Sequence, residues 1–280
     1  AMPFAMNSFG IYCNDAMFEE AGLEFPTTWD ELMEVCEAFQ ANGITPFTFV
    51  DKDPGNLVQE AERLIGIVKN DIYKDCEEVG TDDASFTSED KPYFRQMAEA
   101  ILKTREYAGD TLSFGVEQAT SDFANGKYPM YVSITAKYAV ISQNNPDLKF
   151  TLIPYPNPVS DVQSLPINVD IAYGVSSKTP HQEEAKKFIE FLSRPEIYQM
   201  VADEEGTPPV IEGVNYNIEP LKMIKETIDN GNTFLTMVNF WPSGWRSEWS
   251  VYVQQLISDK NIDTLLTETD RICKEKYTAQ

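Results

Sequence analysis

Short strand-like runs alternate with helical segments along most of this chain, and this alternation limits the folds open to it. The strand-like runs fall at residues 9–13, 45–50, 129–134, 150–155 and 168–175. The spacing of apolar residues predicts helices at 27–42, 93–107, 117–125, 183–192, 221–228, 243–257 and 262–277, and a further helix that starts at 195. The acidic stretch 70–91 lacks a clear period and is interpreted as a surface excursion. Alternating strands and helices indicate an α/β architecture with a largely parallel or mixed sheet.

Two helix starts carry a capping signal. Thr28 and Glu31 have the spacing of a capping box, in which each side chain bonds the backbone amide of the other residue. Thr179, followed by Pro180 and Gln182, is interpreted as a second cap. The helix behind it carries an apolar stripe that we expect to be buried, made of Ala185, Phe188, Ile189 and Leu192.

The charge balance excludes several kinds of partner. Lys and Arg total 22 against 45 Asp and Glu, so the 280-residue chain carries a net charge of −23. Such a chain repels phosphate backbones and anionic headgroups, so we expect no nucleic-acid partner. The apolar runs are too short and interrupted to span a membrane.

Catalytic and metal motifs are missing from the sequence. Its only histidine is His181, at a helix start, which leaves a Ser-His or Cys-His relay without a base. The four cysteines lie far apart, lack a CxxC pair and are interpreted as reduced thiols: Cys13, Cys36, Cys76 and Cys273. We therefore expect no enzyme activity, no metal and no cofactor. The many carboxylates leave a glycosidase dyad as the alternative, and a pure interaction module is a third possibility.

Five motifs in order carry a resemblance to a known family. Residues 10–23 (GIYCNDAMFEEAGL) and 25–32 (FPTTWDEL) together form the first motif, and residues 43–47 (GITPF) and 123–130 (FANGKYPM) are the second and third. The block from 173 (YGVSSK) through 193 to Pro195-Glu196, and then residues 206–209 (GTPP), complete the series. Together they resemble the family 1 extracellular solute-binding proteins, which include the maltodextrin-binding proteins.

The resemblance implies a fold and a function. The expected fold is an α/β lobe of the type II periplasmic-binding-protein kind, a mixed sheet flanked by helices, with a partial second lobe. Residues 1–168 and 212–280 would form the second, C-terminal lobe, and residues 170–210 a returning segment of a truncated first lobe. The implied function is carbohydrate binding for an ABC importer: the protein captures an oligosaccharide outside the cell and delivers it to the permease transmembrane subunits. The implied location is extracellular, as a lipoprotein or in the periplasm, although the first residues (AMPF) lack the pattern of a signal peptide.

Sugars are held by aromatic stacking and by hydrogen bonds to their hydroxyl groups. Alignment with the family places ligand contacts at these positions: Asn7, Asp53, Asn56, Thr135, Tyr138, Trp241, Trp245, Arg246 and Trp249. Ala136 stands where the family often has a stacking tryptophan. Several of these residues have an equally good structural explanation: Asn7, Asp53 and Asn56 as turn formers, Tyr138 and the tryptophans as core, and Arg246 as a surface ion pair.

Truncation of one lobe has two expected consequences. Affinity for sugar should be weak, because a two-lobed clamp draws its affinity from both walls. The apolar stripe of helix 183–192 would lose its partner sheet, and we expect it to pair with a second copy of the chain next to the open strand edge at 168–175.

Overall fold

The computed structural model describes residues 1–82, 84–242 and 244–275, and it confirms the alternation of strands and helices. The strands are β1 (Met2–Asn7), β2 (Phe9–Asn14), β3 (Phe47–Thr48), β4 (Met130–Ile134), β5 (Phe150–Pro154), β6 (Leu165–Tyr173) and β7 (Thr233–Leu235). The first six α-helices are α1 (Asp15–Ala21), α2 (Trp29–Ala41), α3 (Pro54–Val68), α4 (Tyr73–Cys76), α5 (Tyr93–Arg105) and α6 (Val116–Ala124). The others are α7 (Lys137–Asn144), α8 (Gln182–Leu192), α9 (Pro195–Glu205), α10 (Lys222–Asp229), α11 (Trp245–Asp259) and α12 (Ile262–Cys273).

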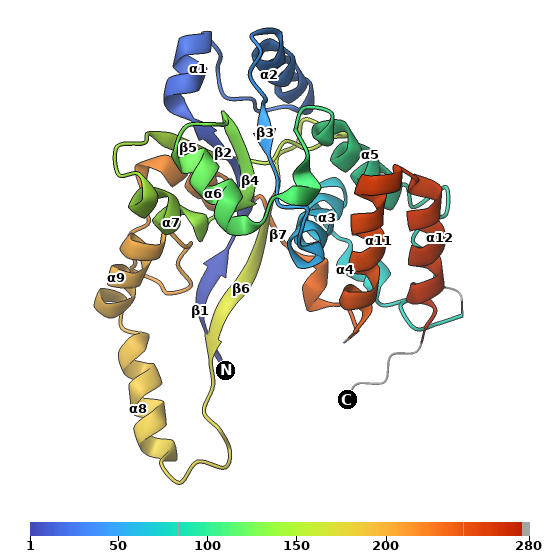
Figure 1. Cartoon of the computed structure of the whole chain (residues 1–280). Coiled ribbons are helices and arrows are strands. Elements are labelled where there is room, and N and C mark those ends of the chain that lie inside the picture. Colours follow the sequence, from blue (N-terminus) through green and yellow to red (C-terminus); the bar gives the residue numbers. More distant parts are fainter. Residues whose placement is uncertain (83, 243, 276–280) are drawn as a thin grey trace.

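The strands form two sheets joined by a continuous piece of chain. One sheet has the order β3-β4-β2-β5, with β3 parallel to β4 and antiparallel pairing elsewhere. The other has the order β1-β6-β7, with β1 antiparallel and β7 parallel to β6. Only Ser8 separates β1 from β2, so the chain passes directly from the second sheet into the first (Figure 1).

Helices cover both faces of the four-stranded sheet. Side chains of β2 alternate in the expected period of two: Phe9, Ile11 and Cys13 enter the main core, and Tyr12 enters a smaller core on the other face. The main core joins the sheet to α2, α3, α5, α11 and α12, whereas α6 and α10 close the smaller one. The α/β expectation, with mixed sheets flanked by helices, is confirmed.

The two helix starts have different outcomes. At α2 the capping box is present, since the Glu31 amide donates to Thr28 Oγ1 at 3.3 Å and the Thr28 amide donates to Glu31 Oε2 at 3.1 Å. At α8 the predicted cap is wrong: the N-cap is His181, without a side-chain cap bond. Thr179 Oγ1 instead accepts from the His181 amide at 3.2 Å, which makes a turn before the helix.

Several element boundaries also correct the prediction. The stretch 70–91 is more than a surface excursion, because Ile72, Cys76, Ala84 and Phe86 are buried in the main core. Strand β6 begins three residues before 168, and strands β1 and β7 and helix α7 were not predicted. The helix expected at 262–277 ends at Cys273, and its last two predicted residues, with Ser243 of the helix expected at 243–257, lie outside the described residues.

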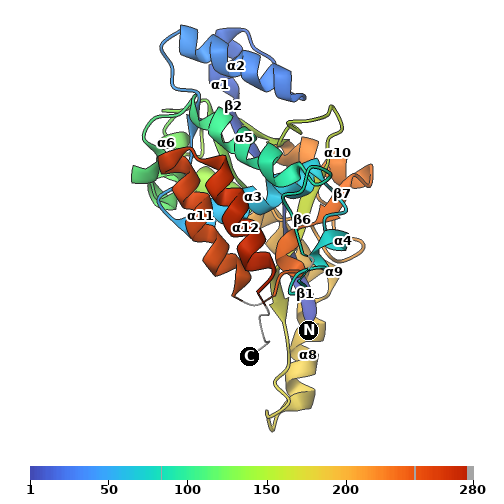
Figure 2. The ribbon, with the colours of Figure 1, turned by 90° about the vertical axis from the view of Figure 1, so that its right-hand side faces the viewer.

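Helix α8 and the far half of β6 extend away from the rest of the molecule (Figures 1 and 2). The expectation of a buried apolar stripe on α8 is wrong, because none of its residues is buried and Phe188 is 62% exposed. In the described chain no other element covers this helix closely, and only Leu192 at its end packs against the small cluster of Phe4, Tyr198 and Ala202. The apolar side chains of α8 therefore have no partner surface within the described chain, apart from the contact of Leu192.

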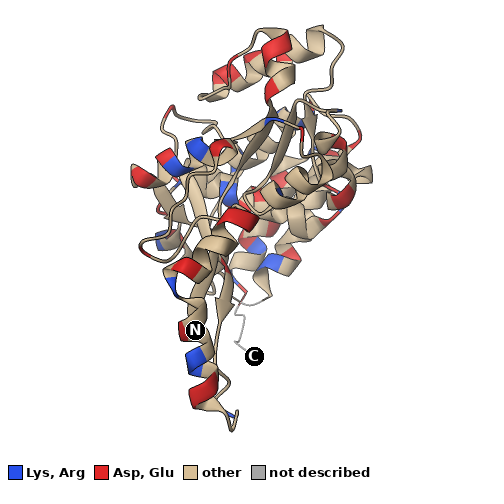
Figure 3. Ribbon diagram, turned by 90° about the vertical axis from the view of Figure 1, so that its left-hand side faces the viewer, with Lys and Arg blue, Asp and Glu red and all other residues tan. Residues whose placement is uncertain are grey.

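Acidic side chains are spread from α1 and α2 at one end to α8 at the other, where basic ones are interleaved with them (Figure 3). All four cysteines are free and buried. Among the described helices, none has the length and apolar character that crossing a membrane requires.

Candidate functional site

The polar side of α3 lines two adjoining hollows. Leu57, Val58, Ala61, Leu64 and Ile65 bury one side of this helix in the main core. Asn56, Gln59 and Arg63 follow one another at intervals of three and four residues and therefore share another side. The first hollow, of about 150 Å³, lies between this side of α3 and the ends of β3 and β4. The second, of about 170 Å³, lies between α3, β6 and the start of α11.

The first hollow combines aromatic and polar lining. Phe9, Phe49 and Tyr131 contribute rings, and Asn56, Ser133 and Lys137 contribute hydrogen-bonding groups. The second hollow is lined mainly by polar side chains: Asn7, Gln59, Glu62, Arg63, Asn168, Asp170, Thr236 and Arg246. Gln59, Arg63 and Ile134 line both, so the two hollows are neighbours along the helix, and we call the pair the trough. This trough is the candidate ligand site.

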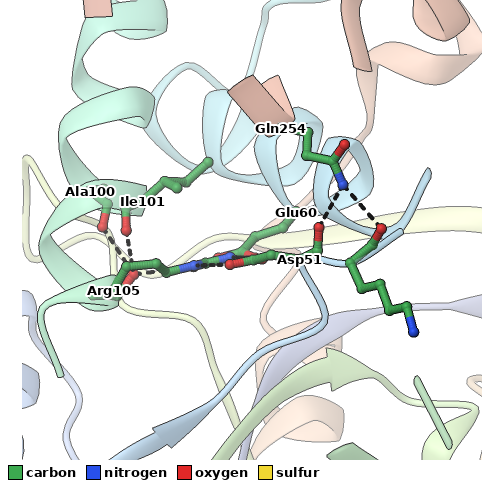
Figure 4. Close-up of polar contacts among 8 residues, drawn as sticks. Asp51, Glu60, Ala100, Ile101, Arg105 and Gln254 are labelled. Atoms are coloured by element: carbon green, nitrogen blue, oxygen red, sulfur yellow. Dashed lines mark hydrogen bonds and ion pairs between the residues drawn. The ribbon is translucent and has the colours of Figure 1, made fainter. Parts of the chain in front are cut away.

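A buried ion cluster fixes α3 behind the first hollow (Figure 4). Arg105, at the end of α5, bonds Asp51 through Nε at 3.0 Å and Nη2 at 2.7 Å. Its Nη1 and Nη2 bond the two carboxylate oxygens of Glu60 at 2.7 and 2.6 Å. Burial raises the pKa of Glu60, and Arg105 opposes that rise. Because loss of one partner from a buried ion pair costs about 3–5 kcal/mol, the cluster ties the loop before α3, α3 itself and α5 firmly together.

A second ion pair lies at the other end of the trough. Arg246 of α11 donates from Nε to Glu62 Oε2 at 3.1 Å, and its Nε is 3.0 Å from Oε1. The Glu62 side chain is only 3% exposed. Burial raises the pKa of Glu62 to about 7, against the opposing charges of Arg246 and Arg63. The pair holds α11 to α3 at the edge of the second hollow.

The structure brings some of the predicted site residues to the trough. Asn7 lines the second hollow, and its Oδ1 accepts from Thr135 Oγ1 at 3.3 Å. Thr135 itself is fully buried and also accepts from the Ser8 amide at 3.1 Å, so it supports the Asn7 side chain from behind. Asn56 lines the first hollow and Arg246 the second, in the ion pair that the sequence allowed.

Other predicted residues have structural positions. Asp53 is the N-cap of α3, where it accepts from the Gly55 amide at 2.8 Å and from Asn56 Nδ2 at 3.0 Å. Tyr138 packs on the smaller core, with its ring 6.0 Å from that of Phe150. Neither lines the trough.

The expected ligand contacts at Trp245 and Trp249 are wrong, because both side chains are buried. Trp245 and Trp249 have no exposed surface and belong to the main core, and Trp241 stacks on Trp245 at a centroid distance of 3.4 Å. Trp249 donates to Thr269 Oγ1 of α12 at 2.9 Å. Their spacing of four residues puts them on one face of a helix, and that face is turned to α5 and α12 rather than to the trough. In this structure a sugar could not stack on Trp245 or Trp249.

Sequence reasoning missed several lining residues, which are Asp51, Gln59, Glu60, Glu62 and Arg63, and it also missed the supporting Arg105. A signal for some of them exists, because polar Asn56, Gln59 and Arg63 recur at helical spacing within an otherwise apolar segment. The turn-forming residues Asp53, Pro54 and Gly55 at the start of the segment dominate its local pattern, so its polar side is hard to recognise from the sequence.

A family model of bacterial extracellular solute-binding proteins matches residues 2–199, which is more than half of the chain, and the chain therefore belongs to this family. Its fold is that of the periplasmic binding proteins, as the solved relatives also show.

Individual relatives are more distant. The chain is 25% identical over 239 residues to a multiple sugar-binding protein of Streptococcus mutans, which covers 81% of this chain but 56% of that protein. The chain thus spans little more than half the length of this curated relative. The solute-binding protein RafE in complex with raffinose is 22% identical, with a TM-score of 0.83 over 99% of this chain and 73% of its own. A sugar transporter protein of Bacillus licheniformis in complex with stachyose is 23% identical, with a TM-score of 0.76 over 97% of this chain and 72% of its own.

Proposed function

We propose that this chain is the oligosaccharide-binding component of an ABC importer, or a major part of it. In this proposal it captures a sugar outside the cell and delivers it to the permease subunits, as a periplasmic protein or as an anchored lipoprotein. Residues 1–168 and 212–280 are proposed to form one lobe, and residues 170–210 a segment that belongs to the opposing lobe. Membership of the solute-binding family and the sugar-binding relatives support the proposal.

The trough is the observation on which the proposed ligand class depends. The trough and its support contain equal numbers of basic and acidic side chains. The basic ones are Arg63, Lys137, Arg246 and the supporting Arg105, and the acidic ones are Asp51, Glu60, Glu62 and Asp170. A compensated site favours a neutral ligand, because an ionic ligand would leave one charge unbalanced in a partly desolvated groove. Amide and hydroxyl groups beside aromatic rings suit the hydroxyl-rich edges and apolar faces of a neutral sugar.

Ligand-observed NMR with raffinose and stachyose tests the proposal. We expect reversible binding of low affinity, because a clamp draws its affinity from both walls and this chain presents mainly one. Absence of any binding to either sugar would contradict the proposed function, and tight binding would contradict the prediction that the opposing wall supplies most of the affinity.

The same samples distinguish a binding protein from the glycosidase alternative. Asp51 and Glu60 both line the first hollow, but Arg105 holds each of them with two hydrogen bonds. Carboxylates held in this way are poorly placed to exchange protons with a sugar. We therefore expect unchanged oligosaccharide after prolonged incubation, and steady release of monosaccharide would establish the alternative.

A further inference from the structure

Arg63 is a buried cation with unused hydrogen-bonding capacity. It is 7% exposed, and among the described residues its only acceptor is Gln59 Oε1, which Nη1 and Nη2 each reach at 3.3 Å. A guanidinium has five N–H groups. Three of those on Arg63 therefore have no acceptor in the described part of the chain, although an unsatisfied buried donor of this kind is costly.

Nearby groups do not supply the missing acceptors. Glu62 is paired with Arg246, and Glu60 with Arg105. Asp170 lines the second hollow but forms no ion pair with Arg63 within the described residues. The ring of Phe9 lies 5.4 Å from the guanidinium carbon and supports its face without accepting a hydrogen bond. The side chain is thus held in place while part of its donor set stays available.

Its position joins the two hollows. Gln59 and Arg63 are the polar residues that both hollows share. Each hollow alone, at about 150 and about 170 Å³, is smaller than a typical small-ligand pocket. Such pockets start at about 300 Å³, a size that the two hollows reach only together. A ligand that fills the trough must therefore pass over Arg63.

We propose that Arg63 is the ligand-anchoring residue of the trough and that it selects for sugars of at least two units. Neighbouring hydroxyl oxygens near one glycosidic linkage accept from the free guanidinium N–H groups, and the units on either side occupy the two hollows. This inference rests on the proposed function and adds to it a named specificity-determining residue and a minimum ligand length.

The test makes two comparisons of binding affinity in the full chain: a long against a short sugar, and the unmodified chain against variants that lack the Arg63 donors. Ligand-observed NMR titrations use raffinose and, as the single-unit probe, galactose. Arg63→Met removes the donors at similar side-chain length, Arg63→Lys keeps the charge but loses the planar fork, and Arg95→Met is the matched control. Arg95 is a partly exposed residue of α5 that pairs with Asp263 and lines neither hollow.

The unmodified chain should bind raffinose about tenfold or more tightly than galactose. Arg63→Met should weaken raffinose binding by about 10- to 100-fold, the range for lost hydrogen bonds to a charged group. The affinity of Arg63→Lys for raffinose should lie between those of the unmodified chain and of Arg63→Met. Arg95→Met should bind raffinose as tightly as the unmodified chain does. Near-UV circular dichroism of each variant verifies the fold.

The outcomes separate this inference from the proposed function. Raffinose binding by Arg63→Met at the unmodified affinity, or equal affinity of the unmodified chain for raffinose and galactose, overturns the inference and leaves the proposed function standing. Absence of binding by the unmodified chain overturns both. If Arg63→Met does not fold, Arg63→Lys and the comparison of ligand lengths still decide: full affinity in Arg63→Lys without any preference for raffinose overturns the inference.

Discussion

Glu62 shows how a single buried carboxylate couples the candidate site to pH. Its folded-state pKa of about 7 lies above the ordinary value of 4.5, chiefly because of burial. The folded chain therefore holds the proton more tightly than the unfolded chain does. The stability that this provides is fully present below about pH 4.5 and is lost as the pH rises through about 7.

The Glu62→Gln variant resembles the protonated form at every pH. The difference in free energy of unfolding, unmodified chain minus variant, should fall by about 2 kcal/mol between about pH 5.5 and about pH 8. Urea denaturation at both pH values measures it, and Glu34→Gln, at an exposed position on α2, is the control. A difference that stays constant with pH would show that Glu62 is ionised throughout this range.

Local chemistry determines which site residues could be predicted from the sequence. Asn7 and Asn56 were found through the family pattern, and Arg246 through its position next to the tryptophans. Arg63, Glu62 and Arg105 were not found, because their importance depends on partners far away in the sequence, such as Asp51 for Arg105, 54 positions apart. The tryptophans could not be assigned, because one helical face serves equally well as a core and as a ligand platform.

At the scale of elements, the two local capping signals had different outcomes: the reciprocal capping box of α2 was confirmed, whereas the Thr179 cap of α8 was wrong. The capping box of α2 involves residues three positions apart and was predicted in full. Helix α3 was recognised only at its start, because buried Glu60, Glu62 and Arg63 interrupt its apolar period. The candidate trough lies along this helix, so the element that lines the candidate site was only partly visible in the sequence.

The position of α3 depends on close packing against β7. A Cβ atom on Gly66 would lie 2.1 Å from the Phe234 ring. Gly66→Ala should gain about 1 kcal/mol of helix propensity but lose about 1–3 kcal/mol through overpacking. We therefore expect net destabilisation of about 1 kcal/mol in urea denaturation.

Two variants make this prediction specific. Gly109→Ala is the matched control, because nothing lies within 4 Å of the added atom. Phe234→Leu combined with Gly66→Ala should recover part of the loss, since the smaller side chain relieves the collision. Stabilisation by Gly66→Ala alone would show that the ring moves aside freely and that propensity dominates.

At the scale of the whole molecule, the resemblance predicted the fold class and the family correctly, because five motifs follow in order from residue 10 to residue 209. It could not predict how α8 is placed. Beyond Ile167, one edge of β6 pairs with no described strand, and Val169 and Ile171 are 49% and 43% exposed. Phe188 of α8 is exposed as well. Exposed apolar side chains and an open strand edge both favour association.

We predict that the chain self-associates through α8 and that Phe188→Glu combined with Ile189→Lys yields a monomer. The free energy of unfolding of that monomer should stay within about 0.5 kcal/mol of the unmodified monomer, because α8 buries none of its residues. Sedimentation velocity over a concentration series, with denaturation at low concentration, measures both quantities. Glu183→Lys combined with Lys187→Glu, a charge exchange among exposed residues of the same helix, is the control. An unmodified chain that stays monomeric at high concentration would contradict the prediction.

The stacked tryptophans also determine what intrinsic fluorescence can measure in this protein. Three of the four indoles lie in one cluster, with centroids 3.4 to 6.1 Å apart, in which Trp245 and Trp249 are fully buried and Trp241 is partly buried. The fourth, Trp29, lies 6.5 Å from the ring of Tyr155. None of the four lines the trough. Intrinsic emission should therefore follow melting of the main core faithfully and change little when a sugar is added. A silent fluorescence titration would thus carry no information about affinity for sugar.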